Sequence, residues 1–521
     1  MSSIPKGKPN VLFIITDQHR ADHVGFGGNS VVSTVHLDAL ASRSTVFDRA
    51  YVANPVCMPN RSSIMTGRMP SAHGVIFNDR SLSPDANTFV GQLRKVGYQT
   101  ALIGKSHLQH GMSREAIADL PGDSSRDSLW VKGWDTVEHQ ERYENGDTPK
   151  PDDFYGFEHI ELTLGHGAWT GGHHYQWARE RGATHEQLVA GYTHNSDVQR
   201  RSPLWWQIHD APFPEELYST SFVTERTISF IESASRQKEP WMVWCSFPDP
   251  HHPLSPPARW LDRHDPDDIV LPESFTDPGE DWPRHVAGIR RLDPDDHNFV
   301  QPFGPTPELA RASIAATYGM IECVDEGVGK ILATLTRLGI EEDTIVIFTS
   351  DHGDMMGDHG LMLKGGMHFQ GCLRVPLTIH VPGNDAARTT SLASSLDLAQ
   401  TILDLCDVTP LQGMQGKSLM PILSDPHASV RTHVLVEDDF PPSEGRRGMP
   451  LKIRTVLSDL GRYTRDTNKH EQLFHLDNDP LEMVNLAVHG RDPGRRDEMV
   501  SQLVDAMIAA DDIARVEPVS Q

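Results

Sequence analysis

A short segment of this chain, Cys57-Met58-Pro59-Asn60-Arg61, combines a potential nucleophile, a helix start and a permanent positive charge. Proline has a fixed φ and no N–H group, so Pro59 suits the first turn of a helix. Cys57 would then lie at the helix N-terminus, where free N–H groups and the helix dipole stabilise a developing negative charge. Arg61 adds a cation that does not titrate near neutral pH. The segment therefore indicates chemistry on an anionic ester.

Two further residue pairs could hold a metal ion. Asp17 and Gln18 come just after an apolar run, and Asp351 and His352 come just after another. If the two runs form neighbouring strands, two carboxylates, an imidazole and an amide oxygen meet around one divalent cation. An imidazole nitrogen suits Mn²⁺ or Zn²⁺ better than Ca²⁺, so we favour Mn²⁺ and place Ca²⁺ next.

Apolar runs alternate with helical patterns along the chain. Short runs rich in branched residues predict buried strands at Val11 to Ile15, Ala101 to Ile103, Trp241 to Phe247 and Thr344 to Phe348. Helical patterns cover Asn87 to Val96, Ser221 to Ser233, Pro307 to Leu338 and Leu396 to Cys406. The alternation predicts an α/β fold with a large, mostly parallel sheet sandwiched by helices. Such sheets bind ligands at the carboxyl ends of their strands, where the residue pairs above lie.

The remaining segments predict long loops and a second, smaller unit. Residues 104–206 and 249–305 are rich in Pro, Gly, His, Trp and Asp without long periodicity, so we expect loops that roof the site. After about residue 425, apolar runs at 434–436, 452–457 and 472–476 predict a small antiparallel sheet. We therefore expect a catalytic domain over residues 1–425 and a small C-terminal α+β subdomain with its tail over residues 426–521.

Composition limits the partners and the compartment. The 521 residues include 47 Lys and Arg against 72 Asp and Glu, a formal net charge of −25. Nucleic acids and anionic membranes favour a positive surface, so we expect neither as a partner. Five widely spaced cysteines favour free thiols in a reducing compartment, and we expect the cytoplasm. The apolar run at 11–15 is too short for a signal core or a membrane span. A homo-oligomer is compatible with the sequence.

The segment from Cys57 to Arg61, with the later pair Thr66-Gly67, resembles the sulfatase signature C-x-P-x-R followed by T-G. On these motifs the chain resembles the formylglycine-dependent sulfatases and phosphonate monoester hydrolases of the alkaline phosphatase superfamily. Asp477 to Leu486 also resembles an ending common in sulfatases. The resemblance implies that a formylglycine-generating enzyme oxidises Cys57 to formylglycine before folding is complete, and that residue 57 then completes the metal site.

The resemblance also assigns roles to the two residue pairs. Asp17, Asp351 and His352 match metal-binding positions of the family. Gln18 stands where many arylsulfatases have a second aspartate, and His352 stands where they have asparagine. Both differences follow the pattern of the phosphonate monoester hydrolases.

Five more residues match functional positions of the family. Lys105 and His107, in a G-K-x-H segment, resemble a lysine that contacts the sulfate and a histidine that helps to deprotonate the aldehyde hydrate. His251, in a P-H-x-P loop, resembles a residue that binds the ester and protonates the leaving oxygen. Lys364 resembles the lysine that holds the transferred group, and Asn78 resembles a substrate-contacting asparagine of the phosphonate hydrolases.

These matches imply a metal-dependent, promiscuous hydrolase of small-molecule sulfate monoesters, similar to arylsulfatases. The hydrated formylglycine would attack sulfur in line with the leaving group, and C–O cleavage would then release sulfate. The alternative is a phosphonate monoester or phosphodiester hydrolase with the same nucleophile: Gln18 and His352 favour it, whereas Lys105 and His107 favour sulfate esters. A catalytically silent homologue that only binds anions is disfavoured, because every matched position holds a competent residue.

Overall fold

The computed structural model describes residues 8–78, 80–111, 133–190, 197–290, 302–440 and 451–511. Its larger sheet contains β1 (Asn10–Thr16), β2 (Thr45–Tyr51), β3 (Gln99–Gly104), β4 (His159–His166), β5 (Trp169–Gly172), β6 (Trp241–Ser246), β7 (Thr344–Ser350), β8 (Leu377–His380) and β9 (Ala387–Ser394). Its smaller sheet contains β10 (His433–Phe440), β11 (Leu451–Ser458), β12 (Gly461–Asp466) and β13 (Glu471–Phe474).

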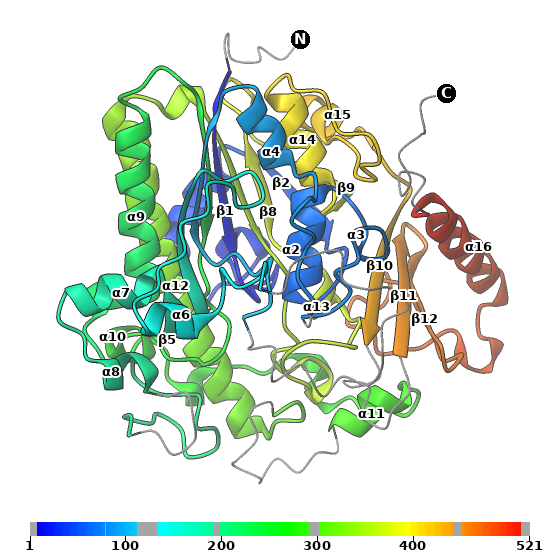
Figure 1. Ribbon diagram of the computed structural model, residues 1–521. Coiled ribbons are helices and arrows are strands. Elements are labelled where there is room, and N and C mark those ends of the chain that lie inside the picture. Colours follow the sequence, from blue (N-terminus) through cyan, green and yellow to red (C-terminus); the bar gives the residue numbers. More distant parts are fainter. Residues whose placement is uncertain are drawn as a thin grey trace.

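The strand order confirms the predicted fold class. The larger sheet runs β5-β4-β3-β6-β1-β7-β8-β2-β9, and the smaller one runs β10-β11-β12-β13 (Figure 1). At its centre, β1 pairs in parallel with both β6 and β7, and β3 pairs in parallel with β4 and β6. Every pair in the smaller sheet is antiparallel. The protein is thus a mostly parallel α/β sheet with a separate antiparallel sheet near the C-terminus.

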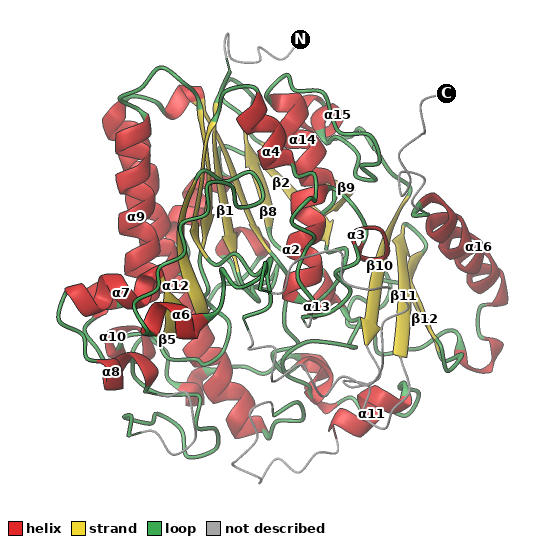
Figure 2. Cartoon of the chain, in the orientation of Figure 1, coloured by secondary structure: helices red, strands yellow, loops and turns green. Residues whose placement is uncertain are grey.

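Helices cover both faces of the larger sheet (Figure 2). The α-helices are α1 (Val35–Ala41), α2 (Cys57–Thr66), α3 (Pro70–His73), α4 (Phe89–Lys95), α6 (Gln140–Glu144), α7 (His173–Glu180), α8 (His185–Val189), α9 (Ser219–Ala234), α10 (Ala258–Leu261), α11 (Arg284–Arg290), α12 (Pro307–Leu338), α13 (Gln370–Leu373), α14 (Asp397–Leu405), α15 (Met420–Ser424) and α16 (Pro493–Ala509). In β1, Phe13 packs in the core that includes residues of α2, α4 and α14. Its neighbour Ile14 packs in the core that includes residues of α9 and α12. The strand is therefore buried on both faces, as its continuous apolar run predicts.

The smaller sheet packs one face on α16. Leu435, Val456 and Leu473 of the sheet share an apolar core with Met499 and Leu503 of that helix. The opposite face of the sheet is turned towards the segment that follows Lys364, because His368 lies within hydrogen-bond distance of Thr455. That second face is mixed: Asp438 and Thr455 are polar, whereas Val436 and Leu457 are apolar and belong to the core that contains Phe13.

Several predicted elements are confirmed, and some regular structure lies where loops were expected. The strands at β1, β3, β6 and β7 and the helix α12 agree with the sequence patterns. The loop prediction for residues 104–206 is wrong in part, because this stretch contains β4, β5, α6, α7 and α8. Residues 112–132 and 191–196 of that stretch, and 291–301 of the second predicted loop, lie outside the described residues.

Two further predictions concern the chain as a whole. The division at about residue 425 stays a prediction, and residues 441–450 and 512–521 of the expected C-terminal subdomain lie outside the described residues. Within the described ranges, no helix combines the length and the apolar character that crossing a bilayer requires.

Candidate active site

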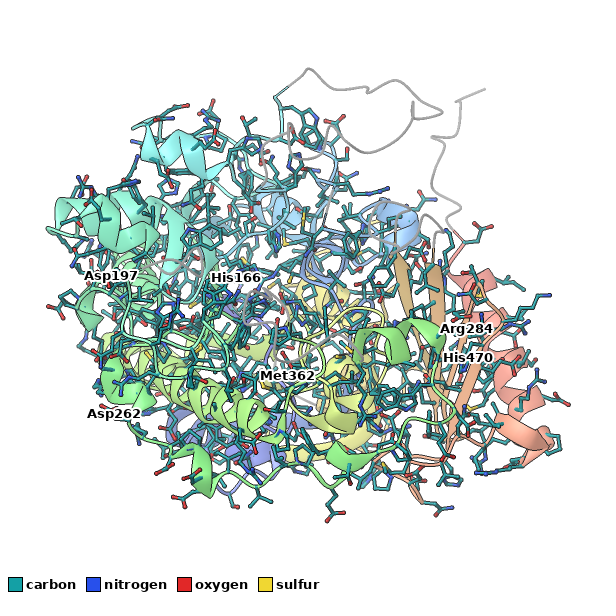
Figure 3. The ribbon with its side chains drawn as sticks, turned by 90° about the horizontal axis from the view of Figure 1, so that it is seen from below. His166, Asp197, Asp262, Arg284, Met362 and His470 are labelled. Carbon is teal, nitrogen blue, oxygen red and sulfur yellow. The ribbon has the colours of Figure 1, made fainter. Side chains whose placement is uncertain are left out.

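The carboxyl ends of β1 and β7 place two aspartates side by side. Thr16 and Ser350 are paired in register at the ends of these parallel strands, so the residues that follow, Asp17 and Asp351, leave the sheet at the same edge. This is the lower edge of the sheet in Figure 1, and Figure 3 views the molecule from that side, with His166 and Met362 near the middle. The prediction that the two strands are neighbours is confirmed.

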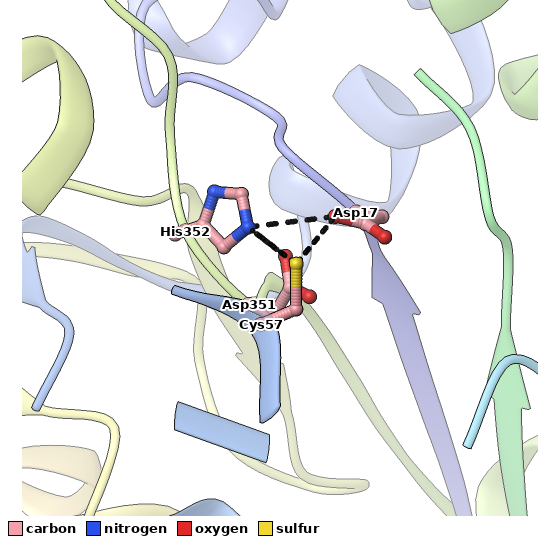
Figure 4. A group of neighbouring side chains, drawn as sticks. All are labelled: Asp17, Cys57, Asp351 and His352. Atoms are coloured by element: carbon pink, nitrogen blue, oxygen red, sulfur yellow. Dashed lines mark hydrogen bonds and ion pairs between the residues drawn. The ribbon is translucent and has the colours of Figure 1, made fainter. Parts of the chain in front are cut away.

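Four buried side chains converge at this edge (Figure 4). One ligand atom from each of Asp17, Cys57, Asp351 and His352 lies within 4.8 Å of the others. Cys57 Sγ is 3.1 Å from His352 Nε2 and 3.8 Å from Asp17 Oδ1. His352 Nδ1 donates to the backbone oxygen of Gly353 at 2.8 Å. Because that bond uses the Nδ1 proton, Nε2 is the nitrogen available for a metal ion.

Cys57 is the first residue of α2, and its surroundings favour negative charge. Every residue of α2 is buried, and Cys57 is 1% exposed. Burial and Asp17 oppose a thiolate at Cys57, but Lys105, Lys364 and His352 outweigh them and lower the pKa of the thiol. The field at position 57 therefore stabilises an anion, as the sequence predicts for a helix N-terminus flanked by cations.

Arg61 and Asp351 form a fully buried ion pair. Arg61 Nε donates to Asp351 Oδ2 at 2.7 Å, and Nη1 donates to the backbone oxygen of Lys105 and to Ser246 Oγ. Burial opposes the charge of Arg61, yet Asp351 and Asp17 outweigh it and raise the pKa of the guanidinium. Arg61 Nη2 is buried and has no hydrogen-bond partner. This group is held in place beside residue 57 and can donate a hydrogen bond that no protein atom accepts.

Lys105 links Asp17 to a histidine that the sequence did not single out. Its Nζ forms an ion pair with Asp17 Oδ2 and lies 2.6 Å from His166 Nε2. Burial alone would raise the pKa of Asp17, but Lys105, His251 and His166 hold it well below its usual range. His166 Nε2 also lies 3.3 Å from Asp17 Oδ2. Asp17, Lys105 and His166 thus form one charged unit.

His166, His251 and His252 form a stack of imidazole rings. The ring centres of His166 and His251 are 3.6 Å apart, and those of His251 and His252 are 4.1 Å apart. Burial, followed by Lys105, lowers the pKa of His166 to about 3. Burial, followed by His166 and Lys364, lowers the pKa of His251 well below its ordinary value. His251 Nδ1 donates to the backbone oxygen of His252, which leaves Nε2 free to exchange a proton.

Gln18 lies beside the cluster, and its amide lies within hydrogen-bond distance of Asp354, Lys364 and His252. Its Nε2 donates to Asp354 Oδ2, and its Oε1 accepts from Lys364 Nζ. Its backbone N–H donates to Asp351 Oδ1 at 3.1 Å. Lys364 is therefore held at the site through Gln18, and the role of the Gln18 oxygen as a metal ligand stays a prediction.

His107 and Asn78 occupy the edges of the site. The backbone N–H of His107 donates to Glu138 at 2.8 Å, and its ring Nδ1 is buried without a hydrogen-bond partner. Burial, followed by Lys105, lowers the pKa of His107 well below its ordinary value. Asn78 Oδ1 accepts from the N–H of Met58 at 3.0 Å, so it satisfies a free donor in the first turn of α2.

Sequence reasoning missed His166 and Asp354. His166 ends β4, inside the stretch predicted as loop, and no motif marks it. Asp354 comes three residues after Asp351, and its Oδ1 accepts from the backbone N–H groups of Met356 and Leu363. For Asp354 the sequence does hold a signal, since this carboxylate belongs to the same polar segment as Asp351.

Comparisons with known proteins show which proteins this chain is similar to. The family model described as Sulfatase matches residues 9–408, and the one described as N-sulphoglucosamine sulphohydrolase, C-terminal, matches residues 357–509. An arylsulfatase of Clostridium perfringens is 29% identical over 487 residues, which cover 92% of this chain and 90% of the relative. A choline-sulfatase of Rhizobium meliloti is 29% identical over 499 residues, 94% of this chain and 84% of the relative.

A solved structure shares the fold. The phosphonate monoester hydrolase of Agrobacterium radiobacter superposes with a TM-score of 0.78 at 24% sequence identity, and the match covers 98% of each chain.

Proposed function

This chain belongs to the sulfatase family and hydrolyses sulfate esters, and we propose that it does so with a formylglycine derived from Cys57 and one divalent cation. One observation carries the proposal: Asp17, Asp351 and His352 surround Cys57 Sγ at the start of a buried helix. Arg61, Lys105 and Lys364 add three positive charges around the same point. An anionic ester next to position 57 would meet these charges in a buried, preorganised site.

The residues present fit a divalent cation. Two ligand atoms on opposite sides of such an ion lie about 4 to 5 Å apart, and the four ligand atoms here lie within 4.8 Å of one another. Two carboxylates and a neutral imidazole nitrogen are the donor set that Mn²⁺ accepts, with Ca²⁺ as the second choice. When present, the cation supplies Lewis-acid charge at position 57, and formylglycine supplies a hydroxyl nucleophile in its hydrated form.

The other residues bind the ester and move protons. Arg61 Nη2 has an unused bond, and Lys105 and Lys364 carry donors that can turn from Asp17 and Gln18 towards sulfate oxygens. His251 offers Nε2 to the leaving oxygen, because its Nδ1 is held by the His252 carbonyl. A bound anion opposes the effect of burial and raises the pKa of His251, so we expect the imidazole to be protonated when the ester is bound.

His107 serves as the base in this proposal. Its pKa is lowered by burial and by Lys105, so the ring is neutral at physiological pH. Its Nδ1 has no hydrogen-bond partner and can therefore accept a proton from the hydroxyl at residue 57.

Maturation by a formylglycine-generating enzyme is part of the proposal. The five cysteines are free and buried in the structure, which supports a reducing compartment such as the cytoplasm.

Phosphonate monoesters or phosphodiesters are a second candidate substrate class. Gln18 and His352 carry this candidate, because an amide in place of a carboxylate removes one negative charge at the metal, and an imidazole nitrogen in place of an amide oxygen changes the preference of the site for a metal. Lys105 and His107 favour sulfate esters, because they belong to a G-K-x-H segment that resembles the one in sulfatases. The two classes share an in-line geometry, so promiscuity is the expected outcome.

The test is a ratio of rates on two chromogenic esters. Protein is produced together with a formylglycine-generating enzyme, conversion of residue 57 is verified by peptide mass spectrometry, and Mn²⁺ is supplied. We expect a higher kcat/KM for nitrophenyl sulfate than for the nitrophenyl ester of phenylphosphonate. A ratio that favours the phosphonate would establish the second candidate. Fully converted, metal-loaded protein that hydrolyses neither ester would contradict the proposal.

A further inference from the structure

The ligand atoms around Cys57 lie at the separations of a tetrahedral metal site (Figure 4). Cys57 Sγ is 3.1 Å from His352 Nε2 and 3.8 Å from Asp17 Oδ1. His352 Nε2 is 3.5 Å from Asp17 Oδ1 and 3.7 Å from Asp351 Oδ1. In a tetrahedral zinc site, bonds of about 2.0 to 2.3 Å place neighbouring ligand atoms about 3.3 to 3.8 Å apart. Three of the four separations fall in this range, and the fourth is slightly shorter.

Each carboxylate of the cluster is oriented by a cation. Asp17 Oδ2 pairs with Lys105 Nζ, and Asp351 Oδ2 accepts from Arg61 Nε at 2.7 Å. The other oxygen of each aspartate, Oδ1, is the one that lies near His352 Nε2. The His352 ring is held in the same way, through its Nδ1 proton. Such outer contacts fix the direction of metal ligands before an ion arrives.

The four ligands are shut off from solvent. Asp17, Asp351 and His352 are 0% exposed, and Cys57 is 1% exposed. Catalytic zinc sites keep one position for water or substrate, whereas structural zinc sites are filled by four protein ligands. While residue 57 is a cysteine, the cluster has the second pattern.

The sulfur atom decides which metal this donor set prefers. A thiolate is a soft ligand that selects Zn²⁺, whereas oxygen ligands suit Mn²⁺ or Ca²⁺. A metal ion that coordinates a thiol also removes its proton. One thiolate and two carboxylates exceed the charge of a divalent ion by one, and the ammonium group of Lys105 beside Asp17 offsets this excess. The set therefore fits Zn²⁺ in both ligand type and charge.

A second group of ligand atoms is less suitable for zinc. Asp17, His166 and His251 also place ligand atoms within 4.8 Å of one another. The ammonium group of Lys105 already contacts Asp17 and His166 there. The rings of His166 and His251 are stacked, with centres 3.6 Å apart and planes inclined by 16°. A metal ion binds an imidazole nitrogen in the plane of the ring, so two stacked rings cannot both point at one ion unless they turn.

We propose that the chain with an unoxidised Cys57 is a zinc-binding protein. The ligands are the Cys57 thiolate, His352, Asp17 and Asp351. Conversion of Cys57 to formylglycine replaces the sulfur by oxygen, opens the closed ligand shell and shifts the preference of the site from Zn²⁺ to harder ions such as Mn²⁺. This zinc site lies outside the proposed function, because unoxidised protein has no formylglycine with which to hydrolyse an ester.

The test compares the metal affinities of proteins that differ at one sulfur atom. Full-length protein is produced without a formylglycine-generating enzyme and freed of metal with a chelator, and peptide mass spectrometry verifies an unmodified cysteine at residue 57. Cys57→Ser puts a hard oxygen in place of the sulfur. Cys245→Ala is the matched control, because Cys245 is equally buried but lies in β6 and in neither ligand group. Melting temperatures verify that each protein is folded.

The expected result is a change in metal preference. Dissociation constants for Zn²⁺ and Mn²⁺ are measured by competition with a chelating dye. Loss of one of four ligands removes roughly a quarter of the binding free energy of a structural zinc site, which is about 100-fold in affinity. Mn²⁺ gains little from sulfur, so the ratio of Zn²⁺ to Mn²⁺ affinity should fall by about 100-fold in Cys57→Ser. In Cys245→Ala the ratio should stay within about twofold of that of the parent protein.

Co²⁺ gives a readout on the parent protein itself. This ion takes the place of Zn²⁺ in tetrahedral sites, and a bond from Co²⁺ to a thiolate adds an intense charge-transfer band in the near ultraviolet. We expect the band in the unoxidised parent protein and in Cys245→Ala, and no band in Cys57→Ser. Protein produced together with a formylglycine-generating enzyme should lose the band in proportion to the conversion of residue 57.

Two results would overturn the inference. One is an equal ratio of Zn²⁺ to Mn²⁺ affinity in the parent protein and in Cys57→Ser, as expected if Zn²⁺ binds Asp17, His166 and His251 instead. The other is Co²⁺ that binds the unoxidised protein without the thiolate band. Failure of the proposed function is distinguishable, because it would appear in converted protein as a lack of hydrolysis.

Discussion

Replacing Lys105 and His166 one at a time and then together tests whether they work as a unit. Lys105 Nζ pairs with Asp17 Oδ2 and lies 2.6 Å from His166 Nε2, and the Lys105 side chain is 4% exposed. If His166 acts by holding this ammonium group in place, its contribution disappears once Lys105 is gone. The double variant should then be hardly worse than Lys105→Ala alone.

The expected sizes follow from the contacts. Loss of one preorganised donor at a transition state costs at least about 100-fold in rate, or about 2.7 kcal/mol. His166 contributes one hydrogen bond to a charged group, so His166→Ala should cost about 1.5 kcal/mol, roughly 10-fold. Independent residues would give about 4.2 kcal/mol in the double variant, roughly 1,000-fold. Coupled residues should leave the double variant within about threefold of Lys105→Ala.

The assay measures kcat/KM on nitrophenyl sulfate for the parent protein, the two single variants and the double variant. The free energy of unfolding, from urea titration, checks that each of the four proteins is folded. His159→Ala is the matched control, because His159 begins the same strand β4 and its side chain is 45% exposed. It should stay within about twofold of the parent protein. A double variant that is 1,000-fold impaired, with all four proteins folded, would refute the coupling.

Three further predictions address the nucleophile, the metal and the pH dependence of stability. Cys57→Ser should allow at most ester formation without turnover, because a serine cannot be oxidised to the aldehyde by the same route; steady-state turnover at the parent rate would count against the mechanism. Chelation should abolish activity and lower the melting temperature, Mn²⁺ should restore both, and Asp351→Asn should not respond; a chelated protein of full activity would exclude a metal role. At Glu161 burial opposes ionisation, but His159 and Arg226 outweigh it and lower the pKa to about 2, below the reference value of 4.5 for the unfolded chain. The ionised carboxylate therefore stabilises the fold by at most about 3 kcal/mol above pH 4.5, and this is lost as the pH falls towards 2. The urea-derived stability difference between the parent and Glu161→Gln should shrink over that range, and a constant difference would show that the pKa is unperturbed.

The elements that position the metal ligands were predictable because their signals are local. A continuous apolar run identified β1 and β7, and a polar residue ended each one. Parallel pairing then brought Asp17 and Asp351 to one edge. Pro59 in the first turn of α2 likewise marked the start of the helix that carries Cys57. In each case, a segment of about ten residues was enough to predict the strand or the start of the helix.

Other parts of the site depend on contacts between distant segments. His166 lies in the site only because β4 ends next to Lys105 and against the His251 loop. The strand itself, His159–His166, mixes polar and apolar residues with glycine, so its pattern resembled a loop. The hydrogen bonds of Gln18 to Asp354 and Lys364 could not be predicted either, because the sequence does not show which way a glutamine amide points.

The burial of α2 has a consequence for how active protein is made. Cys57 is 1% exposed and sits in a helix whose residues are all buried, so an oxidising enzyme must reach it on a chain that has not yet folded. Oxidation and folding then compete in time, and a molecule that folds first keeps its thiol for as long as the fold persists. The active fraction of a preparation is therefore set during synthesis, and slowing translation or lowering the growth temperature should raise it more than any treatment of the purified protein.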